Sequence, residues 1–403
     1  MGIKHLKKLD YLLVITTVLL CLFGLVMVYS ASFPIASVDF GNSRYFYIKQ
    51  LNSIIIGFVL MAITAVIPYR VYGKFSPILV LISIFLLIMV LVPWFGVVRN
   101  NSQRWLQLGP LLIQPTEAVK LVMIIYFASV YAKKQTYINH FWKGVMPPLF
   151  ILGTVFLLIL KQPDLGTATA ILIPCGFILL CSGERAIHLL LLGSIALGGV
   201  GFLALSAPYR LNRILSFRDP FADPFGDGYQ LVSAYHAIAS GGISGKGFGH
   251  SVEKLGYLPE AHTDFIMAVI VEELGVFGLL FIIFSYLFIM YRGVRIALKA
   301  KNSFAKLLAI GLTFQIMVQV IFNLSAVSGL LPITGVPLPF VSYGGSSLVF
   351  MLISIGILVN ISWSRHSYTA KTFQPNERNG GKEYGTQHGI TNDFAGAKSS
   401  LFK

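Results

Sequence analysis

The sequence predicts an all-α polytopic membrane protein with ten transmembrane helices, both termini in the cytoplasm and a large extracellular loop between helices seven and eight. Composition is the first reason: 56% of the 403 residues are hydrophobic and only 12% are charged, which excludes a soluble domain of this size. The second is that the apolar residues gather into separate segments, each long enough or nearly long enough to cross a bilayer. The third is that Lys and Arg concentrate in alternate loops.

The first apolar segment follows Lys4, Lys7 and Lys8 and is too long for the core of a signal peptide, so we expect an uncleaved span. The three cysteines all fall inside apolar segments and are predicted to be small core residues, with no disulfide or metal spacing. The predicted spans are 11–31, 50–69, 76–95, 116–132, 145–161, 166–182, 187–206, 264–291, 304–328 and 344–363.

The basic residues set the predicted orientation. One set of alternate loops, with both termini, carries most of the Lys and Arg near span ends, which places the termini in the cytoplasm and the 207–263 loop outside. The net charge of +15 has this source and does not indicate a nucleic-acid partner. We divide the chain into a ten-span domain, 1–363, and a polar tail, 364–403, that is predicted to be disordered in the cytoplasm.

Several arginines lie on the predicted outer side, against this bias. Arg104 and Arg213 are two of them. Guanidinium groups bind carboxylates and phosphates strongly, so these exceptions predict an anionic ligand at the outer face.

Acidic residues cluster in the stretch 254–275, at the mouth of the eighth span. Glu260, His262, Thr263 and Asp264 come just before a long apolar run, and two more carboxylates lie further along it at 272 and 273. Ionisable groups at a membrane are costly, which favours a functional site. The alternative is that Thr263 caps the helix and that Asp264 or Glu260 complements its dipole. The local pattern is equally compatible with both.

Two charges open the fourth span. Glu117 and Lys120 are three residues apart and share one face of the predicted helix. At this depth they must pair or face water, and a helix-stabilising ion pair accounts for them as well as a functional site does. Trp105, in the preceding loop beside Arg104, is typical of an interfacial anchor.

The hairpin between spans five and six is also polar. Lys161, Gln162 and Asp164 crowd a short turn, in which Asp164 could simply cap the sixth span. Before the last span, the proline and glycine residues of G-V-P-L-P-F-V-S-Y-G-G (335–345) preclude a regular helix around Ser342 and Tyr343. Such a backbone at membrane depth must be buried or line a wet cavity.

The outward ends of spans four, six, eight and ten thus all carry polar groups, which predicts one shared cavity opening outward. The glycine-rich stretch S-G-G-I-S-G-K-G-F-G (240–249) lacks the Lys-Ser/Thr ending of a P-loop, so nucleotide binding is a poor prediction. Neither a zinc-protease motif nor a Gly-x-Ser-x-Gly elbow is present in the sequence. A carboxylate acting as general base remains open.

Five segments together resemble one known family. They are G-L-V-M-V-Y-S-A-S (24–32), R-W-L-Q-L-G-P-L-L-I-Q-P-T-E-A-V-K (104–120), K-Q-P-D-L-G-T (161–167), Y-L-P-E-A-H-T-D-F-I (257–266) and G-V-P-L-P-F-V-S-Y-G-G-S-S (335–347). In order and length they resemble the SEDS family of shape, elongation, division and sporulation proteins, closer to its division and sporulation branches than to its elongation branch. Val271 departs from the glycine expected there.

The resemblance implies a peptidoglycan glycosyltransferase that polymerises lipid II at the outer face of the cytoplasmic membrane, at the division septum. It implies a class B penicillin-binding protein and other divisome membrane proteins as partners. By motif, Asp264 matches the family's essential carboxylate and Trp105 a required loop tryptophan, while Glu117, Lys120 and Asp164 match groups that line a central cavity.

The chemistry of such a transfer suits these residues. Asp264 would take the proton from the acceptor hydroxyl, and arginines or lysines would stabilise the diphosphate leaving group, giving an inverted product. No cofactor is obligatory, although magnesium or manganese could accompany the diphosphate. A lipid II flippase or a non-catalytic scaffold for the cross-linking enzyme would suit the same spans. The predicted substrate-binding or cavity-lining residues are Arg104, Trp105, Glu117, Lys120, Lys161, Gln162, Asp164, Arg213, Glu260, His262, Thr263, Ser342 and Tyr343.

Overall fold

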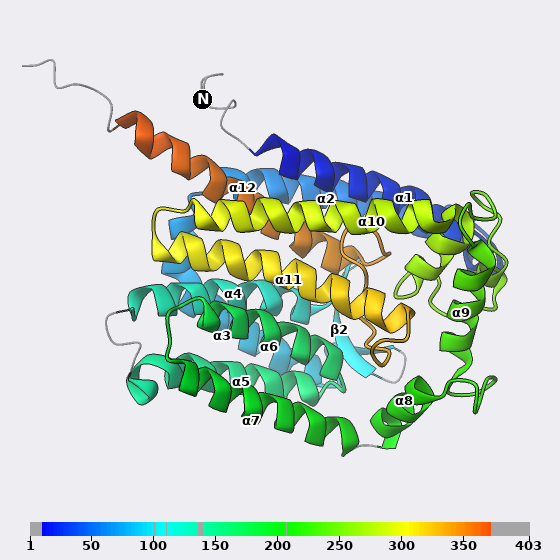
Figure 1. Cartoon of the computed structure of the whole chain (residues 1–403), viewed down its shortest axis with the longest axis horizontal. Helices are drawn as coiled ribbons and strands as arrows, with labels where there is room; N and C mark the ends of the chain where they lie inside the picture. The colour runs from blue at the N-terminus through cyan, green and yellow to red at the C-terminus, as the bar shows by residue number, and fades with distance from the viewer. Residues whose placement is uncertain (1–9, 100–101, 110, 136–139, 207, 372–403) are drawn as a thin grey trace, which may run out of the picture.

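The computed structural model describes residues 10–99, 102–109, 111–135, 140–206 and 208–371 as a bundle of long helices that run side by side (Figure 1). Nine helices in this part of the chain are long and apolar enough to cross a membrane, and a tenth, α6, is apolar but only 16 residues long. They are α1 (Tyr11–Phe40), α2 (Tyr45–Val66), α3 (Tyr69–Leu91), α4 (Pro115–Lys133), α5 (Met146–Leu160, after a π-helical turn at Phe141–Val145), α6 (Leu165–Leu180), α7 (Ala186–Leu205), α10 (Ile266–Leu298), α11 (Ser303–Val327) and α12 (Gly345–Lys371).

Every predicted span overlaps one of these helices, but some helices are longer than predicted. α1 has 30 residues and α10 has 33, so both exceed the ~20 residues that cross a hydrocarbon core. α12 continues past the predicted end at 363, and the tail beyond Lys371 lies outside the described residues. The prediction of cysteines as core residues is confirmed for Cys21 and Cys175, whereas Cys181 is exposed.

The centre of the bundle is formed by α4 and α11, most of whose residues are buried, while α7 buries none. Small residues permit the close packing of these central helices. At Gly311 of α11, an added Cβ would lie 2.6 Å from Ile178 of α6 and 2.7 Å from Ile124 of α4. Only glycine therefore lets the three helices approach this closely.

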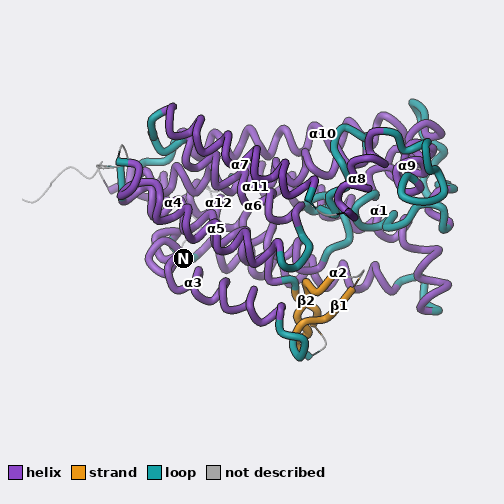
Figure 2. Tube along the Cα trace, turned by 90° about the horizontal axis from the view of Figure 1, so that it is seen from below, coloured by secondary structure: helices purple, strands orange, loops and turns teal. Residues whose placement is uncertain are grey.

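The prediction of an all-helical chain is wrong for the segment between α3 and α4. This segment forms a small antiparallel sheet in the order β1 (Gly96–Arg99), β2 (Ser102–Leu108) and β3 (Leu111–Ile113). Gly109, with φ +60°, allows the tight turn from β2 to β3. Figure 2 shows β1 and β2 towards the end of the bundle that carries α8 and α9.

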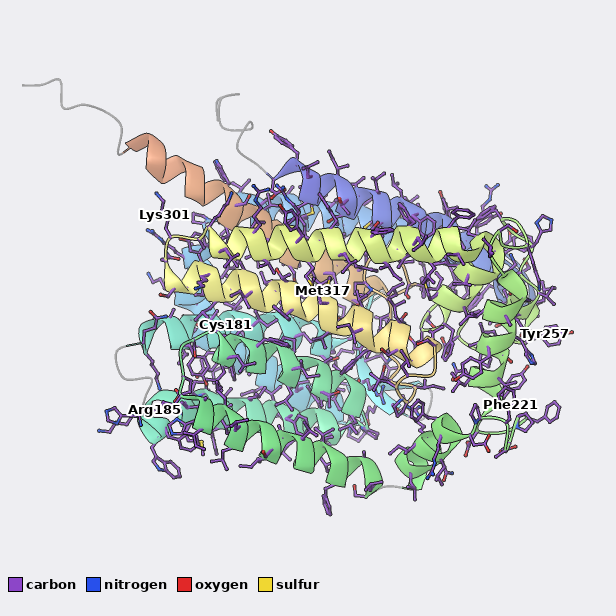
Figure 3. The ribbon with its side chains drawn as sticks, viewed as in Figure 1. Cys181, Arg185, Phe221, Tyr257, Lys301 and Met317 are labelled. Carbon is purple, nitrogen blue, oxygen red and sulfur yellow. The ribbon has the colours of Figure 1, made fainter. Side chains whose placement is uncertain are left out.

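The predicted loop 207–263 also contains helices. α8 (Pro208–Arg218) and α9 (Tyr229–Gly241) pack at one end of the bundle, followed by a 3-10 turn at Glu253–Leu255 (Figure 1). Arg185 and Lys301 lie at the opposite end of the bundle from Phe221 and Tyr257 (Figure 3). The start of α1 and the end of α12 lie at the end that carries Lys301.

The segment 328–344, between α11 and α12, contains no regular helix, as its prolines and glycines predict. Its second half is buried, since Leu338, Phe340 and Val341 are at most 1% exposed, whereas Leu330 in the first half is 72% exposed. α1 packs directly on this backbone, since a Cβ at Gly24 would lie 2.6 Å from the Cα of Val341. Buried non-helical backbone is what the bilayer environment requires.

Candidate functional site

Asp264 lies in the turn immediately before α10 and does not cap that helix. The first helical residue is Ile266, and its N-cap, Phe265, makes no side-chain cap. The Thr263 hydroxyl bonds the carboxylate of Glu260 at 2.6 Å and its carbonyl at 3.1 Å. The prediction that Thr263 caps the helix is therefore wrong, because its hydroxyl is bonded to Glu260 and the N-cap position is Phe265. That Asp264 or Glu260 complements the helix dipole stays a prediction.

The backbone carbonyl of Asp264 accepts a hydrogen bond from a neighbouring helix, whereas its carboxylate accepts none from the described residues. Asn323 of α11 donates to the Asp264 carbonyl at 2.7 Å. No hydrogen bond joins the Asp264 carboxylate to another side chain or backbone group in the described residues, and the side chain stays partly exposed. Gly335 lies close to this carboxylate, since an added Cβ there would lie 3.6 Å from Asp264 Oδ2. The carboxylate is thus partly exposed and has no hydrogen-bond partner in the described residues.

Four charged groups act on Asp264 from different elements. The pKa of Asp264 is raised to about 7, chiefly by burial and then by the negative charge of Glu260. Arg213 of α8 and Arg104 of β2 oppose this increase, while Asp164, at the start of α6, adds to it. The structure therefore brings together charges that are up to 160 positions apart in the sequence.

Arg104 is positioned by the sheet that the sequence did not predict. From β2 it reaches the hairpin between α5 and α6, where its guanidinium lies 3.4 Å from Asp164 and donates to the Gln162 carbonyl at 3.0 Å and to the Pro163 carbonyl. Asp164 also accepts from the N–H of Thr167 at 3.0 Å, so the prediction that it caps this helix is confirmed. Asp164 has both a capping and an electrostatic role.

Glu117 and Lys120 form the ion pair that their spacing predicts. The Lys120 ammonium lies 2.9 Å and 2.8 Å from the two Glu117 oxygens, and both residues are at most 3% exposed. Glu117 lies in the first turn of α4, where its negative charge also complements the helix dipole. The pair is enclosed between helices and does not line an open surface.

Of the remaining predicted residues, two are exposed on the surface and the others are buried or half-buried. Arg213 and Lys161 are exposed, and Arg213 reaches the carbonyl of Ile333 at 3.4 Å. Gln162 is buried and donates to the carbonyl of Leu87 at 3.3 Å, and Trp105 is half-buried in β2.

His262 is buried against the ring of Phe46, with centroids 4.4 Å apart, and 5.6 Å from the ring of Tyr343. Burial lowers the pKa of His262. Ser342 is buried too, and its hydroxyl accepts from the N–H of Leu338 at 2.8 Å. This bond stabilises the segment 328–344.

A second acidic cluster lies within α10. Glu272 accepts from Lys246 at 2.8 Å, from Ser251 at 2.5 Å and from the N–H of Val252 at 2.9 Å. Its neighbour Glu273 accepts from Lys254 at 2.6 Å and from a serine of α1 at 2.7 Å. Both carboxylates are 0% exposed. Every one of these partners except the serine of α1 comes from the segment between α9 and α10.

Two further features bear on ligands. In the described residues no group of three or more His, Cys, Asp or Glu is arranged to hold a metal ion. A pocket of about 620 Å³ opens between α8 and the turn that follows it, lined by residues that include Asn212, Arg218 and Asp223. It contains none of the residues predicted to line a shared cavity.

Sequence reasoning missed Asn323, which holds the Asp264 carbonyl, and Gly335, which lies beside the Asp264 carboxylate. A signal for Asn323 was present: Gln315, Gln319 and Asn323 recur every four residues along an otherwise apolar helix, and all three are at most 1% exposed. Buried amides on one face of a spanning helix mark a place where polar groups must be satisfied.

Comparison with known proteins places the chain among cell cycle proteins. The FtsW, RodA and SpoVE family model, described as cell cycle protein, matches residues 10–367. The probable peptidoglycan glycosyltransferase FtsW of Bacillus subtilis is 46% identical over 387 residues, with 92% of this chain and 95% of that protein covered. Stage V sporulation protein E of the same organism is 43% identical, with 89% and 98% covered.

Solved structures show the same architecture. A chain in a peptidoglycan synthase complex that coordinates polymerization and crosslinking aligns with a TM-score of 0.73 and 26% identity, with 89% of this chain and 98% of that chain covered. The crystal structure of the rod shape determining protein RodA of Thermus thermophilus aligns with a TM-score of 0.67 and 26% identity over the same shares.

Proposed function

Because the chain belongs to the FtsW, RodA and SpoVE family of cell cycle proteins, we infer that it is a peptidoglycan glycosyltransferase that polymerises lipid II into glycan strands during cell division. It is a multi-pass membrane protein. The observation that carries the chemical part of the proposal is the Asp264 carboxylate, which is partly exposed, has no hydrogen-bond partner in the described residues and has a pKa raised to about 7.

Asp264 acts as the general base in this proposal. Glycosyl transfer requires the acceptor hydroxyl to lose its proton as it attacks the anomeric carbon of the donor sugar. A base works best when its pKa is close to the operating pH, and burial brings Asp264 to that range. A carboxylate without hydrogen-bond partners in the described residues can accept the proton without breaking an existing contact.

The leaving diphosphate needs positive charge. Arg213 is exposed on α8 and acts electrostatically on Asp264, so it is the better placed of the two arginines to bind a phosphate oxygen. Arg104 is already committed to Asp164 and two backbone carbonyls. We therefore assign Arg213 to the diphosphate and Arg104 to the structural support of the site.

A resident metal ion forms no part of the proposal. The described residues offer no cluster of carboxylates and histidines for one. A magnesium or manganese ion would instead arrive on the diphosphate of the substrate, whose oxygens are hard ligands of the kind that these ions prefer.

The proposed topology has ten spans, with α6 as the short one, and both chain ends in the cytoplasm. The end that carries α8, α9 and Asp264 then faces outside, where lipid II is polymerised. Support comes from the Lys and Arg bias and from the position of Arg185 and Lys301 at the opposite end of the bundle (Figure 3). In a cysteine-free background, Asp227→Cys should react with an impermeant thiol reagent in intact cells, and Lys301→Cys should not. The reverse labelling contradicts the topology.

We further propose a class B penicillin-binding protein and other divisome membrane proteins as partners, and the division septum as the site of action. A similar chain occurs in a peptidoglycan synthase complex, which supports an enzyme partner of this kind.

Polymerisation in detergent tests the function directly. The purified protein with its penicillin-binding partner should form glycan polymer from lipid II, and the Asp264→Asn protein should form almost none. Transport has no meaning without a bilayer, so polymer formation separates the enzyme from a flippase. Absence of polymer from the wild-type complex would refute the proposal.

A further inference from the structure

Asn323 connects the proposed base to the wall opposite it. It lies on α11 and is 1% exposed. Its amide group donates one hydrogen to the Asp264 carbonyl at 2.7 Å and the other to the Val336 carbonyl at 2.9 Å. One NH₂ group therefore joins three segments: the turn before α10, α11 itself and the segment 328–344.

Nothing in α10 itself fixes the Asp264 backbone in this way. The N–H of Ala268, which would bond the Asp264 carbonyl in a regular helix, bonds the Phe265 carbonyl at 2.9 Å instead. The Asp264 carbonyl thus lies outside the helical ladder and has Asn323 as its donor. Asn323 therefore holds a backbone group of Asp264 that the helix leaves without a partner.

Val336 directly follows Gly335, the residue that faces the Asp264 carboxylate. Gly335 has φ +70°, and a Cβ added there would lie 3.6 Å from Asp264 Oδ2. By holding Asp264 and Val336 together, the Asn323 amide sets the width of the gap between the carboxylate and the Gly335 backbone. If Asp264 is the base, the acceptor hydroxyl must approach its carboxylate, and Gly335 lies beside that carboxylate.

We propose that Asn323 is a positioning residue for glycan polymerisation, which sets the gap between Asp264 and Gly335 through its two hydrogen bonds. The inference rests on the proposed function of Asp264 as the base. Asn323 itself touches no reacting atom; it acts through the backbone of Asp264. When a base is misplaced by about 1 Å, the rate can fall by up to about a hundredfold. An uncharged amide that only holds the backbone of the base can therefore change the rate.

The same helix supplies a matched control. Gln319 lies one turn before Asn323 on the same face and is 0% exposed, but neither atom of its amide has a hydrogen-bond partner in the described residues. Replacing either residue with an apolar side chain of similar size removes one buried amide from α11. Only the Asn323 replacement also releases Asp264 and Val336.

The test compares Asn323→Leu with Gln319→Met in the purified complex, by polymerisation rate against lipid II concentration. We expect Asn323→Leu to lower kcat about tenfold to a hundredfold, with KM changed less than about twofold. Gln319→Met should keep kcat within about twofold, since its amide holds nothing in place. A wild-type kcat in a folded Asn323→Leu protein would overturn the inference.

A double variant separates positioning from general damage. If Asn323 acts through Asp264, then Asn323→Leu should cause no further loss in residual rate once Asp264→Asn is present. Equal fold losses in both backgrounds would overturn the inference even if the single variant is slow. Should Asn323→Leu fail to fold, Asn323→Ala also removes both N–H donors without adding a charge and is used in the same cycle.

The two proposals fail separately. Near-normal polymer formation by Asp264→Asn would refute the role of Asp264 as the base, and the positioning role of Asn323 depends on that role. If Asp264→Asn polymerises slowly, but Asn323→Leu lowers the rate by the same factor with and without Asp264→Asn, only the positioning role of Asn323 is refuted.

Discussion

Two acidic regions lie within fourteen residues of one another, and the structure gives them opposite characters. Glu272 and Glu273 are completely buried, and each is bonded to a lysine and to a serine hydroxyl. Asp264 is partly exposed, its carboxylate has no hydrogen-bond partner in the described residues, and its pKa is raised to about 7. Carboxylates that are fully hydrogen-bonded stabilise structure, whereas a carboxylate without hydrogen-bond partners is free to exchange a proton with a ligand.

The satisfied pair exists because α10 is interrupted. Gly275 has φ 64° and ψ −152°, which breaks the helical ladder after Glu273. The chain between α9 and α10 fills the break: Lys246 and Gly247 donate to the carbonyls of Glu272 and Glu273 at 2.9 Å and 3.0 Å. The two lysines then neutralise the carboxylates that this arrangement buries. The cluster thus anchors the segment that leads to Asp264.

The largest expected effect is on the rate of polymerisation, which a change at Asp264 should lower far more than a change at Glu273. Asp264→Asn keeps the size of the side chain but removes the base, so polymer formation should fall by about a hundredfold or more while the melting temperature is preserved. Glu273→Gln should keep most of the rate and lower the melting temperature, because it removes a charge that pairs with Lys254. Polymer assays and melting curves on both proteins check this. Equal losses of polymerisation rate in the two variants would contradict the distinction between a catalytic Asp264 and a structural Glu273.

The next effect is on stability. Lys254→Met leaves Glu273 buried without its counter-charge, which should cost about 3–5 kcal/mol in the free energy of unfolding. Adding Glu273→Gln should restore part of that loss, because no unpaired charge then remains. Equilibrium unfolding in detergent measures both. A double variant that is as unstable as Lys254→Met alone would show that the lysine acts by packing and not by charge.

Sequence patterns predicted what depends on neighbours within one helical turn. Apolar segments located the nine helices of the described residues that are long enough to cross a membrane, and also the shorter α6. The three-residue spacing of Glu117 and Lys120 predicted their ion pair. Asp164 was predicted as a helix cap for the same reason. Such contacts depend on spacing alone, which a sequence displays directly.

What the sequence did not predict depends on partners that are far apart in the chain. Lys246 meets Glu272 from 26 positions away, and Asn323 meets Asp264 from 59 positions away. The sheet at 96–113 was missed because its strands are only 3 to 7 residues long, too short for an alternating pattern to be recognised. Thr263 was assigned to a cap because the local motif fits, but the helix begins at Ile266, after Phe265.

A pH profile sharpens the comparison further. Only the ionised form of Asp264 can take a proton, so the polymerisation rate should rise about tenfold per pH unit below pH 7 and level off above it. Glu273→Gln should keep this profile, because Glu273 takes no part in the proton transfer. Initial rates between pH 5 and pH 9 on the folded complexes give the midpoint. A flat profile across pH 7 would exclude a base with the pKa of Asp264.

The smallest expected effect is a shift of that midpoint. The charge of Glu260 is the second cause, after burial, of the raised pKa of Asp264. Glu260→Gln removes this repulsion, so the anionic form of Asp264 becomes easier to reach and the midpoint should move to lower pH. The shift should be a fraction of a pH unit, because burial remains, and the plateau rate should change little.

Asp223→Asn is the control: it removes one negative charge from an exposed position on the turn after α8, and Asp223 is not among the groups that shift the pKa of Asp264. A midpoint that moves upward with Glu260→Gln, or moves equally with Asp223→Asn, would mean that Glu260 does not control the proton of Asp264.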